Sequence, residues 1–409
     1  MIMLVADIRI AVLNLRRNTR RTLVATLSVA GGVIAFLLAG GFISWIFQDM
    51  REATIHSQLG HIQIVRPGYF EKGISDPYSY MLPSQSPEQH LIEVDSSVIT
   101  LTPRLAFNGL LSLGDATIPF IGEGIDPERE RPINTRISII DGNDLRTSTD
   151  HAVLLGEGLA KTLGVAVGDM VVLLASSADG SPNAVEVKVS GTFATITKEY
   201  DDNALRLPIQ LARKLMRIDG ATSWIVLLDS TEKTDAIALK LKAILPESSY
   251  SFVTWHELAE FYNKTVMLFS KQVDVVKFII ALIIILTISN TQTMSVLERT
   301  TEIGTSLALG LRRSEILRMF LLEGCMIGIV GGTSGVIIGG SLAQLVSAIG
   351  IPMPPPPGMA RGFTGQILVN WSLAVDGFML AIVTTLLASL MPAWKASRMK
   401  IVDALRTNQ

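Results

Sequence analysis

The chain has 409 residues, of which 48% are hydrophobic and 18% charged, and its mean hydropathy is +0.41. This composition is too apolar for an ordinary soluble protein and too polar for a protein that lies wholly within a membrane. The net charge of −2 gives no support to nucleic-acid binding, which needs a strongly basic surface. We therefore expect several membrane-spanning helices and one large water-soluble domain.

The N-terminal segment predicts a helix that leads into the membrane. Apolar residues recur at helical spacing over 3–18, with arginines on the opposite side, which favours a cytoplasmic amphipathic elbow helix within 1–22. The apolar run 23–47 then predicts the first transmembrane helix. We expect this helix to be retained as a signal anchor; cleavage after the small residues 39–41 is the alternative.

Residues 48–270 predict an extracytoplasmic α+β domain. Strand patterns lie at 61–65, 103–113, 117–122, 136–140, 152–155, 170–175, 184–193 and 222–228. Helical patterns lie at 48–58, 156–163, 208–217, 233–244 and 255–270. The Pro-rich stretch 76–88 is expected to be an irregular arm, and a subdomain boundary is expected near 125–150. Because the single cysteine, Cys325, lies elsewhere, the domain must be held by its core without disulfides.

The second transmembrane helix, expected over 271–296, passes without Pro or Gly into a polar segment, 297–318. The helical pattern that begins near Trp255 runs into this span, and about 40 residues of helix would reach roughly 60 Å. We therefore expect a rigid stalk that ends in a polar helix on the cytoplasmic surface. The hydroxyl and amide side chains in the span are expected to find partners on other helices, or else to lie among lipid headgroups.

The third transmembrane helix, 319–349, is rich in glycine. Two rows of small residues, each at four-residue spacing, predict tight packing on two sides: Gly324, Gly328 and Gly332 in one, and Gly331, Gly335 and Gly339 in the other. Glu323, one turn inside, is expected to hydrate or to pair with an arginine near the cytoplasmic end, and a functional role is the alternative. A short periplasmic loop, 350–370, a fourth span, 371–394, and an amphipathic cytoplasmic tail, 395–409, complete the prediction.

The distribution of basic residues predicts the orientation. Three segments outside the spans are basic, namely Arg9, Arg16, Arg17, Arg20 and Arg21 before the first span, Arg299, Arg312, Arg313 and Arg318 after the second, and Lys395, Arg398, Lys400 and Arg406 in the tail. All three belong in the cytoplasm by the positive-inside rule. The domain 48–270, with 29 acidic and 19 basic residues, belongs outside. Both termini are thus expected in the cytoplasm.

No pattern of catalytic residues is present. The sequence lacks GxxxxGK[ST], HExxH, GxSxG and any cysteine cluster. The GEG at 156–158 follows a strand pattern, but Lys161 stands where a dinucleotide-binding fingerprint needs a small residue. His56 and His61 are expected to be solvated. We therefore predict no catalytic, cofactor or metal site in this chain.

The segment MSVLERTTEIGTSLALGL at 294–311, the glycine-rich span after it and the tail PAWKASRMKIVDALR closely resemble the FtsX-type permeases of ABC transporters, the MacB and LolC/LolE group. The resemblance also covers LNLRRNTRRT, GHIQI and LLGEGLAKTLGVAVGDMVVLL, and so spans nearly the whole chain. It implies a non-enzymatic type VII permease of the bacterial inner membrane, driven by a separate cytoplasmic ATPase dimer that binds ATP and Mg. The large domain favours the lipoprotein-release and MacB-like branches, and GHIQI with the separate-subunit layout makes the lipoprotein-release permeases, LolC/LolE, the closer resemblance.

The resemblance also implies roles for particular residues. In the family, the segment that matches Glu298, Arg299, Thr300, Glu302, Ile303 and Gly304 is the coupling helix that sits in a groove of the ATPase. An interfacial helix without a partner is the alternative. Lipoprotein acyl chains would enter between the first and second spans of two permeases, identical or paralogous, before transfer to a periplasmic carrier. Apolar residues in the outer half are candidate acyl-facing positions, although ordinary lipid-facing residues would look the same: Phe36, Leu37, Phe42, Phe47, Val276 and Ile279.

Three hypotheses about function remain. The first is extraction of lipoproteins or similar amphiphiles, which needs a lateral opening. The second is mechanotransmission to an efflux channel or a cell-wall hydrolase through a periplasmic adaptor, which needs only a moving external domain. The third, a sensor or scaffold, would not need the ATPase-docking segment.

Overall fold

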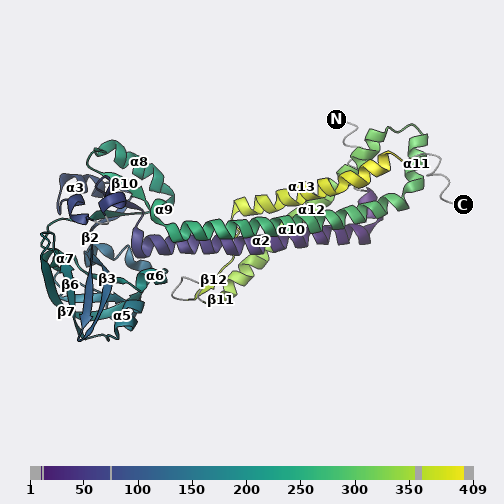
Figure 1. Cartoon of the computed structure of the whole chain (residues 1–409). Coiled ribbons are helices and arrows are strands. Elements are labelled where there is room, and N and C mark those ends of the chain that lie inside the picture. The colour runs from purple at the N-terminus through teal and green to yellow at the C-terminus, as the bar shows by residue number, and fades with distance from the viewer. Residues whose placement is uncertain (1–10, 12, 74–75, 355–361, 400–409) are drawn as a thin grey trace. The chain divides into compact units, whose positions relative to one another are not determined.

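The computed structural model describes residues 11, 13–73, 76–354 and 362–399. The chain divides into a membrane unit, residues 1–47, 266–352 and 364–409, and a domain unit, residues 48–265 and 353–363. Within the described part, four helices are long and apolar enough to cross a membrane (Figure 1). In the sequence, the α+β domain follows the first of them and precedes the second. The predicted fold class is therefore confirmed.

The four candidate spans are Thr19–Leu59, Glu260–Glu298, Arg313–Ile349 and Trp371–Ser397. The first comprises α2 (Thr19–Thr54) and a π-helical turn, Ile55–Leu59; the others are α10, α12 and α13. A short helix, α11 (Thr300–Ala308), joins α10 to α12, and the strands β11 (Ile351–Met353) and β12 (Phe363–Gly365) pair between α12 and α13. Within the predicted elbow 1–22, residues 11 and 13–17 are helical, Asn18 forms a turn, and 19–22 already belong to α2. Residues 1–10 and 12, and the tail beyond Met399, lie outside the described residues.

The glycine rows of α12 lie against two different helices. A Cβ atom at Gly324 would lie 1.9 Å from Ser389 Oγ of α13, and one at Gly328 only 2.3 Å from Thr385 Oγ1. On the other side, a Cβ atom at Gly335 would lie 2.7 Å from Val33 Cβ of α2. Gly332 continues the first row against Phe378, and Gly331 and Gly339 continue the second against Val29 and Leu37. Both helices therefore approach α12 at distances that only glycine permits.

The domain unit is built on a ten-stranded sheet in the order β10-β1-β9-β2-β3-β8-β5-β7-β4, with β6 paired to β2 and β7. Its strands are β1 (Ile62–Val65), β2 (Val98–Leu113), β3 (Ala116–Ile125), β4 (Ser138–Gly142), β5 (Ala152–Gly156), β6 (Met170–Ser176), β7 (Pro182–Ala194), β8 (Ala204–Pro208), β9 (Ser223–Leu228) and β10 (Ser251–Thr254). Its α-helices are α3 (Pro87–Glu93), α4 (Pro127–Glu130), α5 (Glu157–Leu163), α6 (Lys198–Asp201), α7 (Ile209–Met216), α8 (Thr234–Ile244) and α9 (Trp255–Leu258).

Two hydrophobic cores share this sheet. One lies between β2, β3, β5 to β8 and the helices α5 and α7, and the other between β1, β9, β10 and the helices α3 and α8. The predicted subdomain boundary near 125–150 is wrong, because the cores divide along β2 and β9, which are hydrogen-bonded to each other. Strands distant in sequence return to form each core, which a local change in pattern does not reveal.

The predicted long helix is present as the 39-residue α10, but it begins at Glu260 and ends at Glu298, because the chain leaves helical geometry before and after it. Ala259 has φ −79° and ψ 62° between α9 and α10, and Asn263 Nδ2 donates to His256 O at 2.7 Å across this break. Arg299, with φ −101° and ψ 15°, separates α10 from α11. Neither residue is a helix breaker by type, so the sequence carries no signal for these two breaks.

Candidate coupling site

The segment around α11 is held against α12 by an apolar contact. Ile303 and Val296 are buried together with Ile316 and Phe320 of α12. Gly310, at φ +100°, lets the chain turn sharply after α11, because this backbone region is open chiefly to glycine. The next helix, α12, begins at Arg313, where Glu315 accepts a hydrogen bond from the Arg312 backbone N–H at 2.8 Å. The result is a short hairpin of two helices.

Arg299 points from this segment into the bundle. Its Nη1 lies 3.0 Å from Glu323 Oε1, and both side chains are more than nine-tenths buried. Asn14 Nδ2 donates to the same carboxylate oxygen at 2.8 Å, and the Arg299 guanidinium lies 5.6 Å from the centre of the Phe320 ring. Glu323 thus pairs with an arginine, as the sequence predicts. A charge at this depth is tolerable because it is both paired and hydrogen-bonded.

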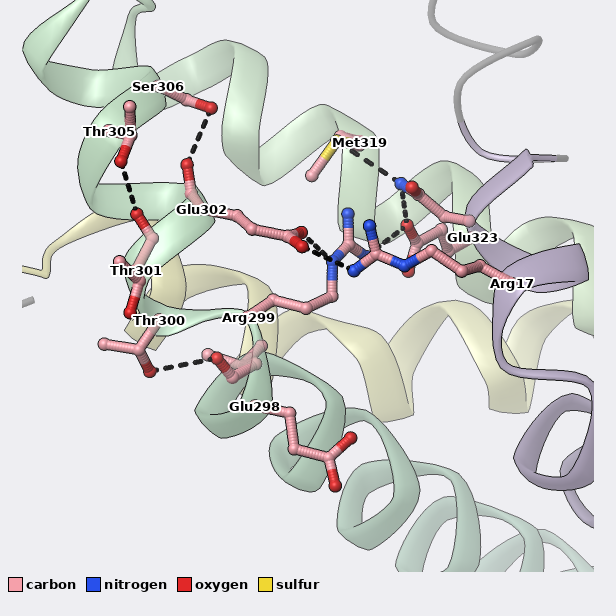
Figure 2. Close-up of polar contacts among 12 residues, drawn as sticks. Arg17, Glu298, Arg299, Thr300, Thr301, Glu302, Thr305, Ser306, Met319 and Glu323 are labelled. Atoms are coloured by element: carbon pink, nitrogen blue, oxygen red, sulfur yellow. Dashed lines mark hydrogen bonds and ion pairs between the residues drawn. The ribbon is translucent and has the colours of Figure 1, made fainter. Parts of the chain in front are cut away.

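The two glutamates of the segment turn towards the N-terminal helix. Glu302 Oε1 lies 2.6 Å from Arg17 Nη2, and its other oxygen lies 3.3 Å from Arg299 Nε (Figure 2). Glu298 forms a two-pronged ion pair with Arg21. These pairs are about half exposed, so each contributes little to stability alone. Together with Asn14, however, they fix the start of α11 between the N-terminal helix and α12.

The predicted coupling residues are partly buried and partly exposed: Arg299 is buried, whereas Glu298 and Glu302 are exposed and pair with arginines of the N-terminal segment. Ile303 and Gly304 are buried, and Thr300 Oγ1 donates to Leu297 O at 2.7 Å. The turn after α11 is exposed as well, with Leu309 80% and Leu311 45% exposed. A 430 Å³ cavity between α11 and α12 lies beside this turn, and its lining includes Leu311 together with the predicted coupling residues Arg299, Glu302 and Ile303. The two leucines were not among the predicted coupling residues, although Leu-Gly-Leu before two arginines indicates an exposed turn.

The candidate acyl-facing residues divide into two groups. Phe36 and Leu37 are buried inside the bundle, where a Cβ atom at Gly377 of α13 would lie 3.3 Å from Phe36. Phe42, Phe47 and Val276 are half-buried, and only Ile279 is exposed. Phe36 and Leu37 were predicted to face an acyl chain because they are apolar, but the small residues on α12 and α13 draw them into the bundle.

A broader apolar face runs along α10. Its large side chains recur at helical spacing and are 46–69% exposed, namely Val275, Phe278, Ile279, Leu282, Ile283 and Leu286. Of the most apolar 18 residues of α10 only 17% are buried, against 33–39% in the other candidate spans. Helix α10 is thus the least covered of the four within the chain. The sequence alone does not distinguish this face from the buried one, because both are apolar.

The domain unit contains a second buried charged cluster, at the end of the first helix. Arg104 binds Glu130 through two nitrogens, at 2.7 and 2.8 Å, and also donates to Gln58 O. Arg206, which is fully buried, donates to Ser57 O at 2.9 Å and lies 3.1 Å from Glu123. Burial alone would raise the pKa of Glu123, but the guanidiniums of Arg206 and Arg104 hold it below its usual value.

Ser57 and Gln58 lie in the π-helical turn Ile55–Leu59, where helix carbonyls have no further partners within the helix. The guanidiniums of Arg104 and Arg206 therefore bind these carbonyl oxygens and compensate the negative end of the helix dipole. The sequence signal for them is a charged residue at an inward-facing strand position: Arg104 in β2 and Arg206 in β8 are both buried among apolar neighbours.

Among the described residues, no group of three or more His, Cys, Asp or Glu side chains could hold a metal ion. The GEG at 156–158 has a packing role, because a Cβ atom at Gly156 would lie 2.1 Å from Asp201 O. His61, predicted to be solvated, is instead buried: its Nδ1 accepts the Leu228 N–H at 3.0 Å and its Nε2 lies 3.0 Å from Thr231 Oγ1. Burial, with the nearby charges of His56 and Arg51, lowers the pKa of His61 to about 4.

Comparison with known proteins finds two family models. A MacB-like periplasmic core domain matches residues 22–244, more than half of the chain, and an FtsX-like permease C-terminal domain matches residues 275–401. The lipoprotein-releasing system transmembrane protein LolC of Xylella fastidiosa strain 9a5c is 28% identical over 342 residues, 78% of this chain and 81% of LolC. An uncharacterised ABC transporter permease of Methanocaldococcus jannaschii, MJ1507, is 26% identical over 66% of this chain and 65% of its own length.

Among solved structures, the periplasmic region of MacB from Actinobacillus actinomycetemcomitans matches with a TM-score of 0.36 and 14% identity, over 50% of this chain and 93% of that one.

Proposed function

This chain belongs to the FtsX/MacB family of ABC transporter permeases, and we propose that it extracts lipoproteins or similar amphiphiles from the outer leaflet of the bacterial inner membrane. In this proposal both termini are cytoplasmic and the large domain is periplasmic. A separate ATPase dimer supplies ATP hydrolysis with Mg, a second permease completes the membrane part, and a periplasmic carrier accepts the cargo. The chain itself carries no catalytic role.

The observation that carries this proposal is the uncovered apolar face of α10. A transmembrane helix that buries only 17% of its most apolar segment has most of its surface left for other molecules. Phe278, Ile279 and Ile283 offer this surface to an acyl chain or to the second permease. A lateral entrance bordered by α10 is the arrangement that extraction from a bilayer needs. The similarity to LolC, a lipoprotein-releasing protein by name, supports the same cargo class.

ATP-driven motion would enter through the helical hairpin α11–α12. We expect the partner ATPase to contact the exposed turn at Leu309 and Leu311, next to the 430 Å³ cavity. Arg299 would then act inside the permease, because its pairing with Glu323 ties the start of α11 to α12. Displacement of α11 would in this way reach both α10, through the chain, and α12, through the ion pair.

Mechanotransmission to an external protein is the second candidate, and the cluster around Arg104 and Arg206 favours it. Arg104 and Arg206 bind the end of the first helix to the core of the domain, so the domain would follow a movement of that helix. This attachment of the first helix to the domain is needed for a moving external domain in either mechanism. It does not by itself require a lipid-exposed entrance.

Site-specific photocrosslinking tests the extraction proposal. A photoreactive phenylalanine analogue placed at Phe278 or Ile283 should form an adduct with a triacylated lipoprotein when both are produced in one bacterial cell. Ile329, 43% exposed on α12, is the matched control position and should give a much weaker adduct. Equal yields at all three positions, or no lipoprotein adduct at the α10 positions, would count against an entrance at α10.

A further inference from the structure

The four arginines at the start of the membrane unit have two different environments. Arg17 and Arg21 pair with Glu302 and Glu298 of the coupling segment. Arg16 and Arg20 are exposed, and neither forms an ion pair with a residue in the described part of the chain. Two exposed guanidiniums thus lie in the same segment as the two paired ones.

An apolar groove of about 440 Å³ lies beside this segment, and Arg16 is among its lining residues. One wall is formed by Leu15 and Leu23, and the other by Met326 and Val330 of α12. Thr22 also lines it, and the hydroxyl of Thr22 already donates to Leu15 O at 2.9 Å, which leaves its methyl group for the groove. The groove therefore combines an apolar floor with a cationic rim, and none of the described residues that line it is acidic.

We propose that this groove binds one acyl chain of an anionic phospholipid from the cytoplasmic leaflet, with the phosphate held by Arg16 and Arg20. Guanidinium groups bind phosphate oxygens in pairs, and unpaired arginines beside a span attract anionic lipid. A zwitterionic headgroup fits less well, because its ammonium group would lie beside two cations. A second copy of the chain fits poorly as well, because it would bury two arginines for which this surface offers no partner.

This site would have a consequence for coupling, and in this respect it rests on the proposed function. Arg17 and Arg21, which hold Glu302 and Glu298, lie in the same short segment as Arg16 and Arg20. A lipid bound to Arg16 and Arg20 would therefore also restrict Arg17 and Arg21, which contact the coupling segment. Anionic lipid would therefore act as a structural cofactor of the permease, distinct from any transported amphiphile.

Native mass spectrometry of the delipidated full chain in detergent tests the proposal directly. The chain is titrated with phosphatidylglycerol or with phosphatidylcholine of the same acyl composition. We expect the wild type to retain one phosphatidylglycerol, with at least a tenfold preference over phosphatidylcholine. The double variant Arg16→Gln/Arg20→Gln should lose this preference, whereas Arg312→Gln/Arg313→Gln, which removes two charges elsewhere, should keep it.

A groove variant separates the acyl site from simple surface attraction. Thr26→Phe fills the groove and should reduce retention of both lipids at least tenfold, whereas Leu27→Phe, at a 58% exposed position on the same helix, should not. Equal retention of the two lipids by the wild type, or the same loss in both arginine variants, would overturn the proposal. So would a wild-type dimer that Thr26→Phe dissociates, because a second copy would then occupy the groove. If the Thr26→Phe variant fails to fold, the comparison of the two arginine double variants tests the proposal by itself. Transport has no part in this assay, so its outcome is independent of the cargo.

Discussion

The Arg299–Glu323 pair connects the coupling segment to the membrane interior. Removing one partner from such a buried pair leaves the other charge uncompensated and costs about 3–5 kcal/mol. Apolar side chains could hold α11 equally well, because replacing a buried ion pair by apolar residues often leaves stability unchanged. The value of the pair is therefore its specificity: Arg299 fixes which turn of α12 meets the start of α11.

The protonation of buried His61 should make the stability of the folded chain depend on pH. Its pKa is about 4 in the folded chain and about 6.5 in the unfolded one, so the unfolded state binds the proton first as pH falls. Stability is therefore complete above pH 6.5 and declines as pH falls towards 4. Between pH 7 and 5 the loss should be about 2 kcal/mol. Thermal unfolding of the full chain in detergent should show it, and His61→Gln, which cannot titrate, should show a smaller loss. Equal pH profiles would contradict the assignment.

At the scale of single helices, the close contact between α12 and α2 makes the effect of a larger side chain predictable. Gly335→Val places side-chain atoms where Val33 of α2 already lies, and overpacking of this kind costs about 1–3 kcal/mol. Gly340, in the same helix, has no atom within 4 Å of its Cβ position. We therefore expect Gly335→Val to lower the unfolding temperature in detergent clearly and Gly340→Val to change it little. A similar decrease in unfolding temperature in both variants would show that helix propensity, and not contact with α2, causes the loss.

The coupling segment predicts a charge-swap result. Glu298→Lys with Glu302→Lys should abolish stimulation of the partner ATPase, because each introduced lysine would face an arginine of like charge. Adding Arg17→Glu and Arg21→Glu restores both pairs with inverted sign and should restore stimulated turnover. Stability should change by less than about 1 kcal/mol in either variant, since these pairs are exposed. If turnover stays lost in the fourfold variant, the glutamates contact the ATPase themselves.

Local patterns predicted most of these elements, and long-range contacts explain what they did not predict. The spans and most strands follow from periodicity, but β8 (Ala204–Pro208) is uniformly buried and β10 (Ser251–Thr254) has only four residues, so neither shows a clear alternation. The coupling segment was located from its polarity and its family resemblance. The orientation of Glu302 was not predicted, because its partner Arg17 lies 285 residues away in sequence.

At the scale of the whole molecule, each unit has the parts that a driven permease needs. The membrane unit presents an exposed turn for an ATPase, a buried ion pair behind that turn and an uncovered apolar face on α10. The domain unit binds the end of the first helix through Arg104 and Arg206. Extraction of an amphiphile gives the face of α10 a direct role in binding the cargo, whereas in mechanotransmission this face would contact only lipid or the second permease.

The most direct test of the account is the intact mass of the purified complex. The full chain is isolated with its partner ATPase in mild detergent and analysed for a bound triacylated lipoprotein before and after addition of ATP and Mg. The account predicts lipoprotein in the first sample and its loss from the second. A complex that binds the ATPase and hydrolyses ATP but carries no lipoprotein in either sample would contradict extraction and leave mechanotransmission as the function.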